Sequence, residues 1–319
     1  MTHEQPAPSA DGILAASRTI NPVFTGSPLI EQQTANAELG LQLFAKVETL
    51  NPIRSFKGRG TDWWMQNEAP GDHPVVSASA GNFGQGLAYA GRARGRKVVI
   101  FSATTANPGK VEAMRRLGAE VRLEGDDFDA AKAAARAYAE INGCPFVEDG
   151  ALRTIAEGAG TIALEITEQL SREGVSLDAI VVPLGNGALL TGIGTWIRAK
   201  APGCKVIGVV ASNAPAMKHS WETGQLVSTK TADTAADGIA VRECVPYALD
   251  CMNSTVDEVW EVSEEAIRRA RDFSLTHYGL VVEEAGVAGL AGLIESGGSL
   301  KGKTVATIFC GGNVRVTAP

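Results

Sequence analysis

The 319-residue chain has few cysteines, no long apolar run and no excess of positive charge. Its five cysteines are scattered and form no CxxC pair, which argues against a disulfide framework and against a zinc site. No apolar stretch approaches the roughly 20 residues that a membrane-spanning helix needs. With 29 basic and 36 acidic residues, the formal charge of −7 disfavours nucleic acid or an anionic membrane as the main partner.

We expect no targeting or regulatory signal at the ends of the chain. Residues 1–16 contain prolines and acidic residues, but no basic region followed by an apolar one, so they do not resemble a signal peptide. Together with the scattered cysteines, this predicts a cytoplasmic protein. Because the chain stops shortly after Asn313, we expect no appended regulatory domain.

Short β-branched runs alternate along the chain with Ala-rich amphipathic segments. Strands that are apolar on both faces are typical of a parallel sheet covered by helices, so the expected fold class is α/β. The expected strands are 74–77, 97–102, 120–123, 179–183, 205–210, 258–262 and 304–309. Helices are expected to begin at Gly84, Pro108, Phe128 and Ala188, and a long helix to follow 258–262.

Polar, turn-forming stretches at 66–74 and 143–150 are the best candidates for domain boundaries. The length of the chain suggests about two domains. The two stretches bracket a small α/β unit between two segments of a larger one. We therefore expect a small domain of residues 70–150 and a large domain of residues 1–69 and 151–319.

The first motif, NPIRSFKGRG at 51–60, places Lys57 just before an amphipathic segment. A lysine at a helix start lies near backbone N–H groups that have no partner in the helix, and their partial positive charge favours the free amine. A free amine can react with a carbonyl group. A solvated lysine at a helix start is the alternative.

Two further motifs run from an apolar strand through a small-residue turn into a helix: SASAGNFGQGLAYAG at 77–91 and VPLGNGALLTGIG at 182–194. Such turns present backbone donors to an anion, and Asn82 adds a side-chain donor. Tyr89 and Leu190 stand where a dinucleotide fingerprint needs its last glycine, and no GKS or GKT follows. Glycines needed only for packing are the alternative for the turn in 77–91.

The fourth motif, FCGGN at 309–313, places Cys310 at the C-terminal end of an expected strand. Ligands of open α/β sheets bind at this edge. A buried structural cysteine is the alternative.

Taken together and in this order, SFKGRG, SAGNFGQG, GNGA and CGGN resemble the fold type II pyridoxal phosphate enzymes, most closely their serine/threonine dehydratase branch. The resemblance extends through SPL at 27–29, FAKVE at 44–48, ADGIAV at 236–241 and VVEEAGVAG at 281–289. It implies pyridoxal 5′-phosphate as the cofactor. It also implies two three-layer αβα domains with mostly parallel sheets, as in the β subunit of tryptophan synthase.

The resemblance implies a role for each matching residue. Lys57 would form a Schiff base with the cofactor and act as the base at the substrate Cα. The other cofactor contacts would be Phe56 and Gly238 at the ring, Asn82 at the 3′ oxygen, Cys310 at the pyridine nitrogen, and Gly185, Asn186, Gly187, Ala188 and Leu189 at the phosphate. The substrate would lie against Ser79, Ala80, Gly81, Asn82 and Phe83.

The implied reaction is α,β-elimination of water from a β-hydroxy amino acid, which yields a 2-oxo acid and ammonia. Cys310 has no fixed negative charge and would not hold the ring nitrogen protonated, which favours prompt loss of a β leaving group. Ala80 stands where racemases of the family have a serine, which disfavours racemisation. Phe83 replaces the usual histidine and Arg54 the usual glycine, so threonine, serine or a bulkier analogue all remain open.

Other expectations concern a metal site, two acidic residues and the partners of the protein. Val210, Ala211 and Ser212 stand where some relatives bind a divalent cation through a glutamate, so we expect no metal there. Asp237 and Glu283 match acidic positions near the active site of relatives, although a solvated or structural carboxylate is the favoured role for each. The family implies an amino-acid substrate and a homo-oligomer, a dimer or tetramer.

The alternatives within catalysis are β-replacement, as in the cysteine synthase branch, and threonine synthase-like chemistry. Those branches usually show NPTGS-type and TSGNTG-type motifs, which this chain lacks. Outside catalysis, the alternatives are a noncatalytic relative that binds the cofactor and a plain nucleotide-binding α/β protein.

Overall fold

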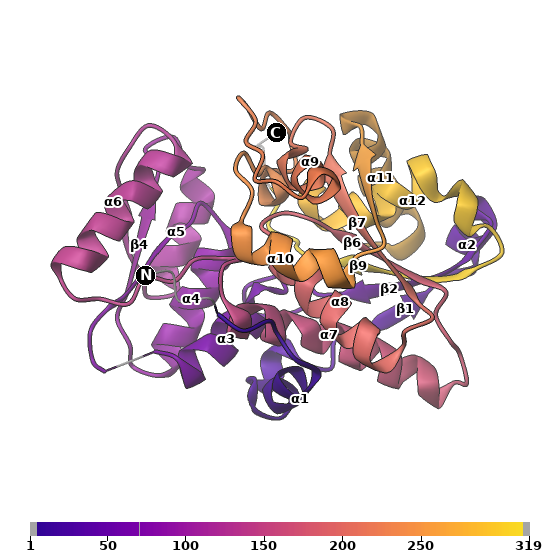
Figure 1. The fold of residues 1–319 in the computed structure, drawn as a ribbon, viewed down its shortest axis with the longest axis horizontal. Helices are drawn as coiled ribbons and strands as arrows, with labels where there is room; N and C mark the ends of the chain where they lie inside the picture. Colours follow the sequence, from indigo (N-terminus) through magenta and orange to yellow (C-terminus); the bar gives the residue numbers. More distant parts are fainter. Residues whose placement is uncertain (1–4, 70, 315–319) are drawn as a thin grey trace.

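The computed structural model describes residues 5–69 and 71–314, which form two sheets flanked by helices (Figure 1). The larger sheet is six-stranded, in the order β1-β2-β9-β6-β7-β8, and β1 pairs antiparallel with β2 while the other pairs are parallel. Its strands are β1 (Leu29–Glu31), β2 (Gln42–Val47), β6 (Ala179–Pro183), β7 (Lys205–Ala211), β8 (Glu258–Val262) and β9 (Thr304–Phe309). The expected α/β class with mostly parallel sheets is confirmed.

The smaller sheet is three-stranded and parallel, in the order β3-β4-β5. Its strands are β3 (Val75–Ala78), β4 (Val98–Ser102) and β5 (Glu120–Leu123). All three fall within residues 70–150, while the strands of the larger sheet fall outside that range. We retain the division into a small domain of residues 70–150 and a large domain of residues 1–69 and 151–319 as a proposal.

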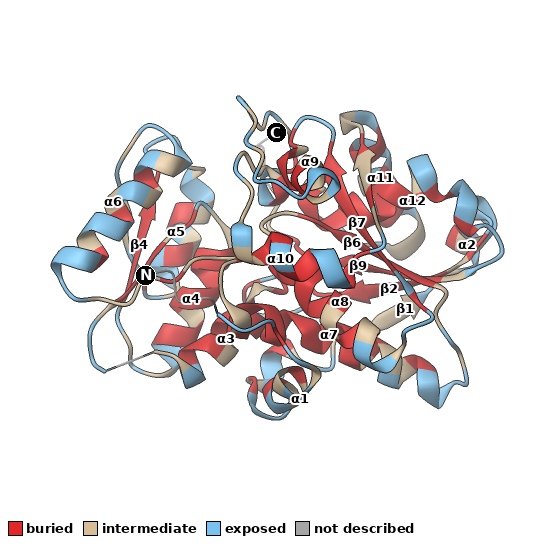
Figure 2. Cartoon of the chain, in the orientation of Figure 1, coloured by how far each residue is buried: buried red, intermediate tan, exposed pale blue. Residues whose placement is uncertain are grey.

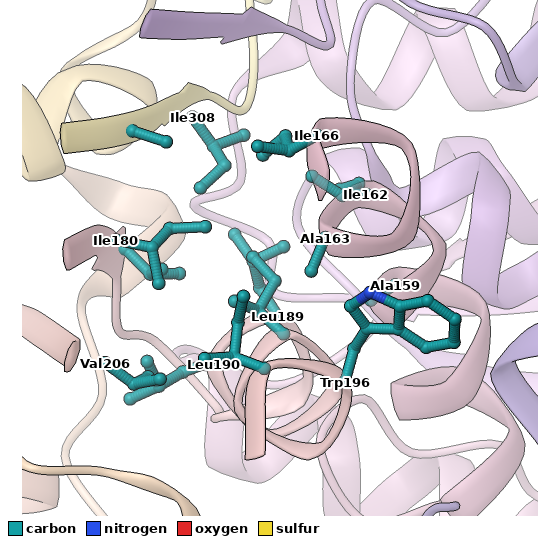
Figure 3. Packing of buried hydrophobic residues seen from close by; sticks show 14 of the residues in the cluster. Ala159, Ile162, Ala163, Ile166, Ile180, Leu189, Leu190, Trp196, Val206 and Ile308 are labelled. Atoms are coloured by element: carbon teal, nitrogen blue, oxygen red, sulfur yellow. The ribbon is translucent and has the colours of Figure 1, made fainter. Parts of the chain in front are cut away.

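Helices cover both faces of the larger sheet. On one face α7 (Arg153–Arg172) and α8 (Ala188–Lys200) pack on the strands, and on the other α11 (Glu264–Tyr278) and α12 (Ala288–Ser296) do so. Figure 3 shows the first of these cores, in which the labelled residues from α7, α8 and three strands are Ala159, Ile162, Ala163, Ile166, Leu189, Leu190, Trp196, Ile180, Val206 and Ile308. Strands β6, β7 and β9 bury side chains on both faces, as their apolar sequences predict.

The smaller sheet is covered in the same way, by α4 (Asn82–Ala93) and α5 (Pro108–Arg116) on one face and by α6 (Phe128–Ile141) on the other. Three alanines at four-residue spacing in α6, Ala131, Ala135 and Ala139, form its buried stripe. Ala134 and Tyr138 pack partly buried beside it, and much of the remaining surface of α6 is exposed (Figure 2). Asp127 caps α6, since its side chain accepts a hydrogen bond from the Ala130 N–H at 2.8 Å.

The remaining helices connect or cover these layers. Helix α3 packs on both α4 and α7, and so lies between the two sheets (Figure 1). The set is α1 (Ala10–Thr19), α2 (Gln33–Leu39), α3 (Lys57–Asn67), α9 (Ala216–Thr223) and α10 (Pro246–Thr255), with short 3₁₀ turns η1 (Pro22–Phe24), η2 (Asp237–Ile239), η3 (Glu284–Val287) and η4 (Gly297–Leu300). Within the described ranges, no helix has both the length and the apolar character to cross a membrane.

The predicted strands are all present, with small shifts at their ends. Strand β3 starts at Val75, one residue later than expected, because Pro74 has no N–H to donate to the ladder. Helix α4 starts at Asn82, two residues before the expected Gly84, because the Ser79 Oγ accepts hydrogen bonds from the backbone N–H groups of Gly81 and Gly84 and turns the chain early.

A buried ionic cluster lies beneath α3. The Arg59 guanidinium is fully buried, 2.8 Å from the Glu48 carboxylate and 2.7 Å from the Glu165 carboxylate. The Lys46 ammonium, also fully buried, lies 2.7 Å from Glu165 and donates to the Ser27 carbonyl oxygen at 2.7 Å. Burial alone would raise the pKa of Glu165, but hydrogen bonds and charge from Arg59, and then from Lys46, lower it to about 2.

We expect this cluster to make stability fall in acid. The Glu165 pKa is below its ordinary value of 4.5, so its ionised form is stabilised in the folded state. That contribution is complete above pH 4.5 and is lost as the pH falls toward about 2. Chemical denaturation across this range should show a weaker pH dependence for Glu165→Gln than for the unmodified protein. Glu168→Gln, which changes an exposed carboxylate on the same helix, should leave the dependence unaltered.

Candidate active site

A cavity of about 650 Å³ opens at the carboxyl ends of the strands and is lined by loops from both sheets. Its size is in the range of small-molecule sites. The structure brings all of the predicted site residues into its lining: Phe56, Lys57, Ser79, Ala80, Gly81, Asn82, Phe83, Gly185, Asn186, Gly187, Ala188, Leu189, Gly238 and Cys310. Segments far apart in the sequence therefore meet at one place.

Lys57 is the first residue of α3, as the motif predicts. Its Nζ lies 4.6 Å from the centre of the Phe56 ring and 5.9 Å from that of Phe83. The same atom is 2.5 Å from Oδ2 of Asp149. Because the Lys57 side chain is only 16% exposed, the solvated-lysine alternative is wrong.

Asp149 belongs to the segment 143–150, which the sequence indicated only as a domain boundary, and no motif pointed to it. A bridge between Phe146 and Val76 of β3 brings this segment beside the smaller sheet. Gly150 then turns with a φ of +82°, where a side chain would lie 2.2 Å from the Asn186 carbonyl oxygen. The Asp149 carboxylate is thereby held inside the cavity, and its Oδ1 is buried without a hydrogen-bond partner among the described residues.

The loop after β3 presents donors to the cavity. The Ser79 hydroxyl organises the turn through the two backbone hydrogen bonds described above. Asn82 is held at both ends of its amide, since its Nδ2 donates to Glu283 at 2.5 Å and its Oδ1 accepts from Asn313 at 2.8 Å. The start of α4 therefore offers fixed backbone N–H groups to an anion such as a carboxylate.

Glu283 lines this cavity and is buried, so the expected role of a solvated carboxylate is wrong for this residue. Burial raises its pKa to about 6, the nearby charge of Lys110 opposes this, and the carboxylate of Asp237 adds to it. One of its oxygens is bound by Asn82, and the other has no partner among the described residues.

The 185–189 loop, as we call this segment, follows β6 and includes the first two residues of α8, Ala188 and Leu189. Gly187 caps the helix with a left-handed φ of +94°. At Gly185 a Cβ would lie 2.7 Å from the Gly238 carbonyl oxygen, so the space there is closed to any larger residue. The first N–H groups of a helix have no partner within it, and together with the helix dipole they stabilise a phosphate.

Cys310 follows directly after β9 and is buried. Burial raises the pKa of its thiol, so the group stays uncharged, and its Sγ lies 3.7 Å from the Ala285 carbonyl oxygen. An uncharged thiol in this lining is a weak hydrogen-bond partner for a ring nitrogen.

Arg54 shows why the family usually has glycine at this position. Its φ is +52°, the only positive value for a non-glycine residue among those described. Its backbone N–H donates to the Asn51 carbonyl oxygen, and its carbonyl oxygen accepts from Gly312. The left-handed turn therefore sets up the approach to Lys57 without placing the exposed Arg54 side chain in the cavity lining.

Two ion pairs tie the smaller sheet's helices to the loop that precedes α10. One joins Lys110 of α5 to Asp237, and the other joins Asp129 of α6 to Arg242. All four residues line the cavity, so these pairs border it on the side of η2.

This set of groups fits pyridoxal phosphate. A buried amine is available for the aldehyde, a glycine-closed helix start for the phosphate, and an uncharged thiol for the ring nitrogen. When bound, the cofactor supplies an electron sink for the substrate Cα. Among the described residues, no three His, Cys, Asp or Glu side chains are grouped to hold a metal ion, and the Ser212 hydroxyl donates to the Val262 carbonyl oxygen.

Comparisons with known proteins agree with this arrangement. The family model described as "Pyridoxal-phosphate dependent enzyme" matches residues 20–311. The chain is 35% identical to L-threonine ammonia-lyase of Thermotoga maritima over 308 residues, 96% of this chain and 76% of that protein. It is 32% identical to the biosynthetic L-threonine dehydratase of Lactococcus lactis over 310 residues, 96% of this chain and 74% of that protein.

A solved structure, the T.th. threonine deaminase, superposes with a TM-score of 0.92 at 31% identity and covers 98% of this chain and 100% of that one. Its fold is the tryptophan synthase β-like fold that the sequence predicts. The family match and these relatives extend over nearly the whole chain. The chain therefore belongs to the pyridoxal-phosphate dependent enzymes, in the branch of the threonine dehydratases.

Proposed function

We propose that this protein removes water from a β-hydroxy amino acid, threonine or serine or a bulkier analogue, and releases a 2-oxo acid and ammonia. The observation that carries the proposal is the position of the Lys57 amine, which shares one cavity with the 185–189 loop and the uncharged Cys310 thiol. The names of the most similar relatives, threonine dehydratases and ammonia-lyases, support the same reaction.

Each residue has a role in this proposal. Lys57 holds the cofactor and later takes the proton from the substrate Cα. The loop at 79–82 binds the substrate carboxylate through backbone N–H groups at the start of α4. Ala80 offers no acid on the opposite face of the substrate, which favours elimination over racemisation.

Phe83 is the residue that we expect to limit the substrate side chain. It is buried in the cavity lining, and its ring lies 5.9 Å from the Lys57 Nζ, near the expected reacting carbon. An apolar ring at this position favours a methyl or larger apolar β substituent over a charged one. Threonine is accordingly the first substrate to test.

We further propose that the enzyme works in the cytoplasm and as a homo-oligomer. All five of its cysteines are free, which suits a reducing compartment. The oligomer, a dimer or tetramer, is proposed from the family alone.

A methyl group at Gly185 should weaken cofactor binding. The Cβ of Gly185→Ala would lie 2.7 Å from the Gly238 carbonyl oxygen, which is backbone, so the phosphate loop has to move. Overpacking of this kind costs about 1–3 kcal/mol, or about 5- to 140-fold in Kd. Titration of cofactor-free protein with pyridoxal phosphate measures this change in Kd. Gly203→Ala, where the added methyl meets open space, is the matched control, and equal Kd values for both variants would contradict the proposed cradle.

The proposed reaction is tested with a panel of β-hydroxy amino acids and the cofactor-loaded protein. We expect oxo acid release from L-threonine or L-serine, and the ratio of their kcat/KM values to report on the space around Phe83. A thiol added to the same assay should leave the product unchanged. A new sulfur-containing amino acid would instead identify a β-replacement enzyme.

A further inference from the structure

We propose that Asp149 carries a proton between Lys57 and the leaving group of the substrate. This inference rests on the elimination proposed above. It adds a second acid–base residue to Lys57, at a position that no sequence motif indicated.

The contacts of Asp149 support this role. Its Oδ2 lies 2.5 Å from the Lys57 Nζ, within direct proton-transfer distance. The Asn186 amide in the 185–189 loop lies 3.4 Å from the same oxygen. The other oxygen, Oδ1, is buried and has no partner among the described residues, although the side chain lines the cavity. The carboxylate thus contacts the lysine through Oδ2, at the wall of the cavity, and Oδ1 has no partner among the described residues.

Among the carboxylates of the described lining, only Asp149 forms an ion pair with Lys57. Glu283 is bound by Asn82, and Asp237 is paired with Lys110. Asp129 is paired with Arg242 at the edge of the cavity. Asp149 is therefore the group placed to exchange a proton with the lysine.

Asp149 can close the proton balance of the reaction. Lys57 takes the Cα proton and becomes an ammonium, while the β-hydroxyl needs a proton to leave as water. Asp149 accepts one proton from the Lys57 ammonium and donates it to the β-oxygen as the carbon–oxygen bond breaks. Lys57 ends as an amine and Asp149 as a carboxylate, so no further acid or oxidant is consumed.

The leaving group provides the test. L-Serine and β-chloro-L-alanine give the same products after elimination, but chloride leaves without a proton. Asp149→Asn keeps the shape of the side chain and an acceptor for Lys57, and removes the transferable proton. We expect it to lower kcat for L-serine by about 10²–10⁴-fold, the usual contribution of a general acid or base, and to spare β-chloro-L-alanine.

Two further readouts separate this role from a structural one. In Asp149→Asn the absorption of lysine-bound cofactor should persist, and the Cα hydrogen of L-serine should still exchange in D₂O, because Lys57 is intact. Glu148→Gln is the matched control, since Glu148 is the adjacent carboxylate, pairs with Lys132 and Arg136, and should affect neither substrate.

Equal slowing of both substrates by Asp149→Asn would overturn the proposal, since Asp149 would then act on Lys57 alone. The unmodified enzyme gives a check that needs no variant: a solvent deuterium isotope effect larger for L-serine than for β-chloro-L-alanine is expected, and equal effects would overturn the shuttle. If the unmodified enzyme eliminates neither leaving group and also releases no oxo acid from L-threonine or a bulkier β-hydroxy analogue, the proposed function itself fails.

Discussion

Replacing Lys57 with alanine should abolish covalent attachment of the cofactor and lower turnover by at least about 10³-fold. The Lys57 amine is the only lysine nitrogen in the described lining that lies beside the Phe56 ring, and it occupies the start of α3. Without it, the cofactor has no amine to join here and the substrate Cα has no base. Cofactor held only by the 185–189 loop should be lost on gel filtration.

A visible spectrum of the purified protein measures this effect. Lys132→Ala is the control, because Lys132 also lines the cavity but pairs with Glu148. We expect Lys132→Ala to keep the absorption band of lysine-bound cofactor and Lys57→Ala to lack it. A band that persists in Lys57→Ala would show that another lysine holds the cofactor.

Arg59→Met should lower the free energy of unfolding by about 3–5 kcal/mol, the usual cost of removing one partner from a buried ionic group. The substitution leaves Glu48 and Glu165 buried, with Lys46 as the remaining cation of the cluster. Because α3 carries Lys57 two residues before Arg59, the same change should also loosen the start of that helix.

Urea denaturation of the cofactor-free protein would measure the loss. Arg172→Met is the matched control, because Arg172 is 76% exposed at the end of α7 and pairs weakly with Glu168. Surface pairs of this kind contribute roughly 0–1 kcal/mol. A double variant, Arg59→Met with Glu48→Gln, should recover part of the stability, whereas an Arg59→Met loss no larger than that of Arg172→Met would contradict the role of the cluster.

The strands were predictable where their sequence is apolar on both faces, as in β6 and β9. Strand β2 was missed because Lys46 interrupts its apolar run, and a lysine is almost never fully buried unless it is paired. Its partner Glu165 lies on α7, far along the chain, so the burial of Lys46 depends on a contact that no local pattern reveals. Strand β1 has only three residues, too few for a recognisable period.

The site, too, was predictable where it depends on local sequence patterns and not where it depends on contacts between distant segments. Loops such as 185–189 follow apolar strands, so their place at the carboxyl edge of the sheet follows from the α/β pattern. Asp149 follows no predicted strand, and its position depends on the Gly150 turn and on the approach of Asn186. Glu283 reaches the cavity through its contact with Asn82, which joins two distant parts of the chain.

The most direct test of the proposed elimination is to incubate the cofactor-loaded protein with L-threonine and L-serine and to quantify ammonia and 2-oxo acid together. Elimination predicts that the two products appear in equal amounts and that both are absent with Lys57→Ala. If neither amino acid, nor a bulkier β-hydroxy analogue, yields oxo acid, or if ammonia appears without it, the proposed elimination is wrong.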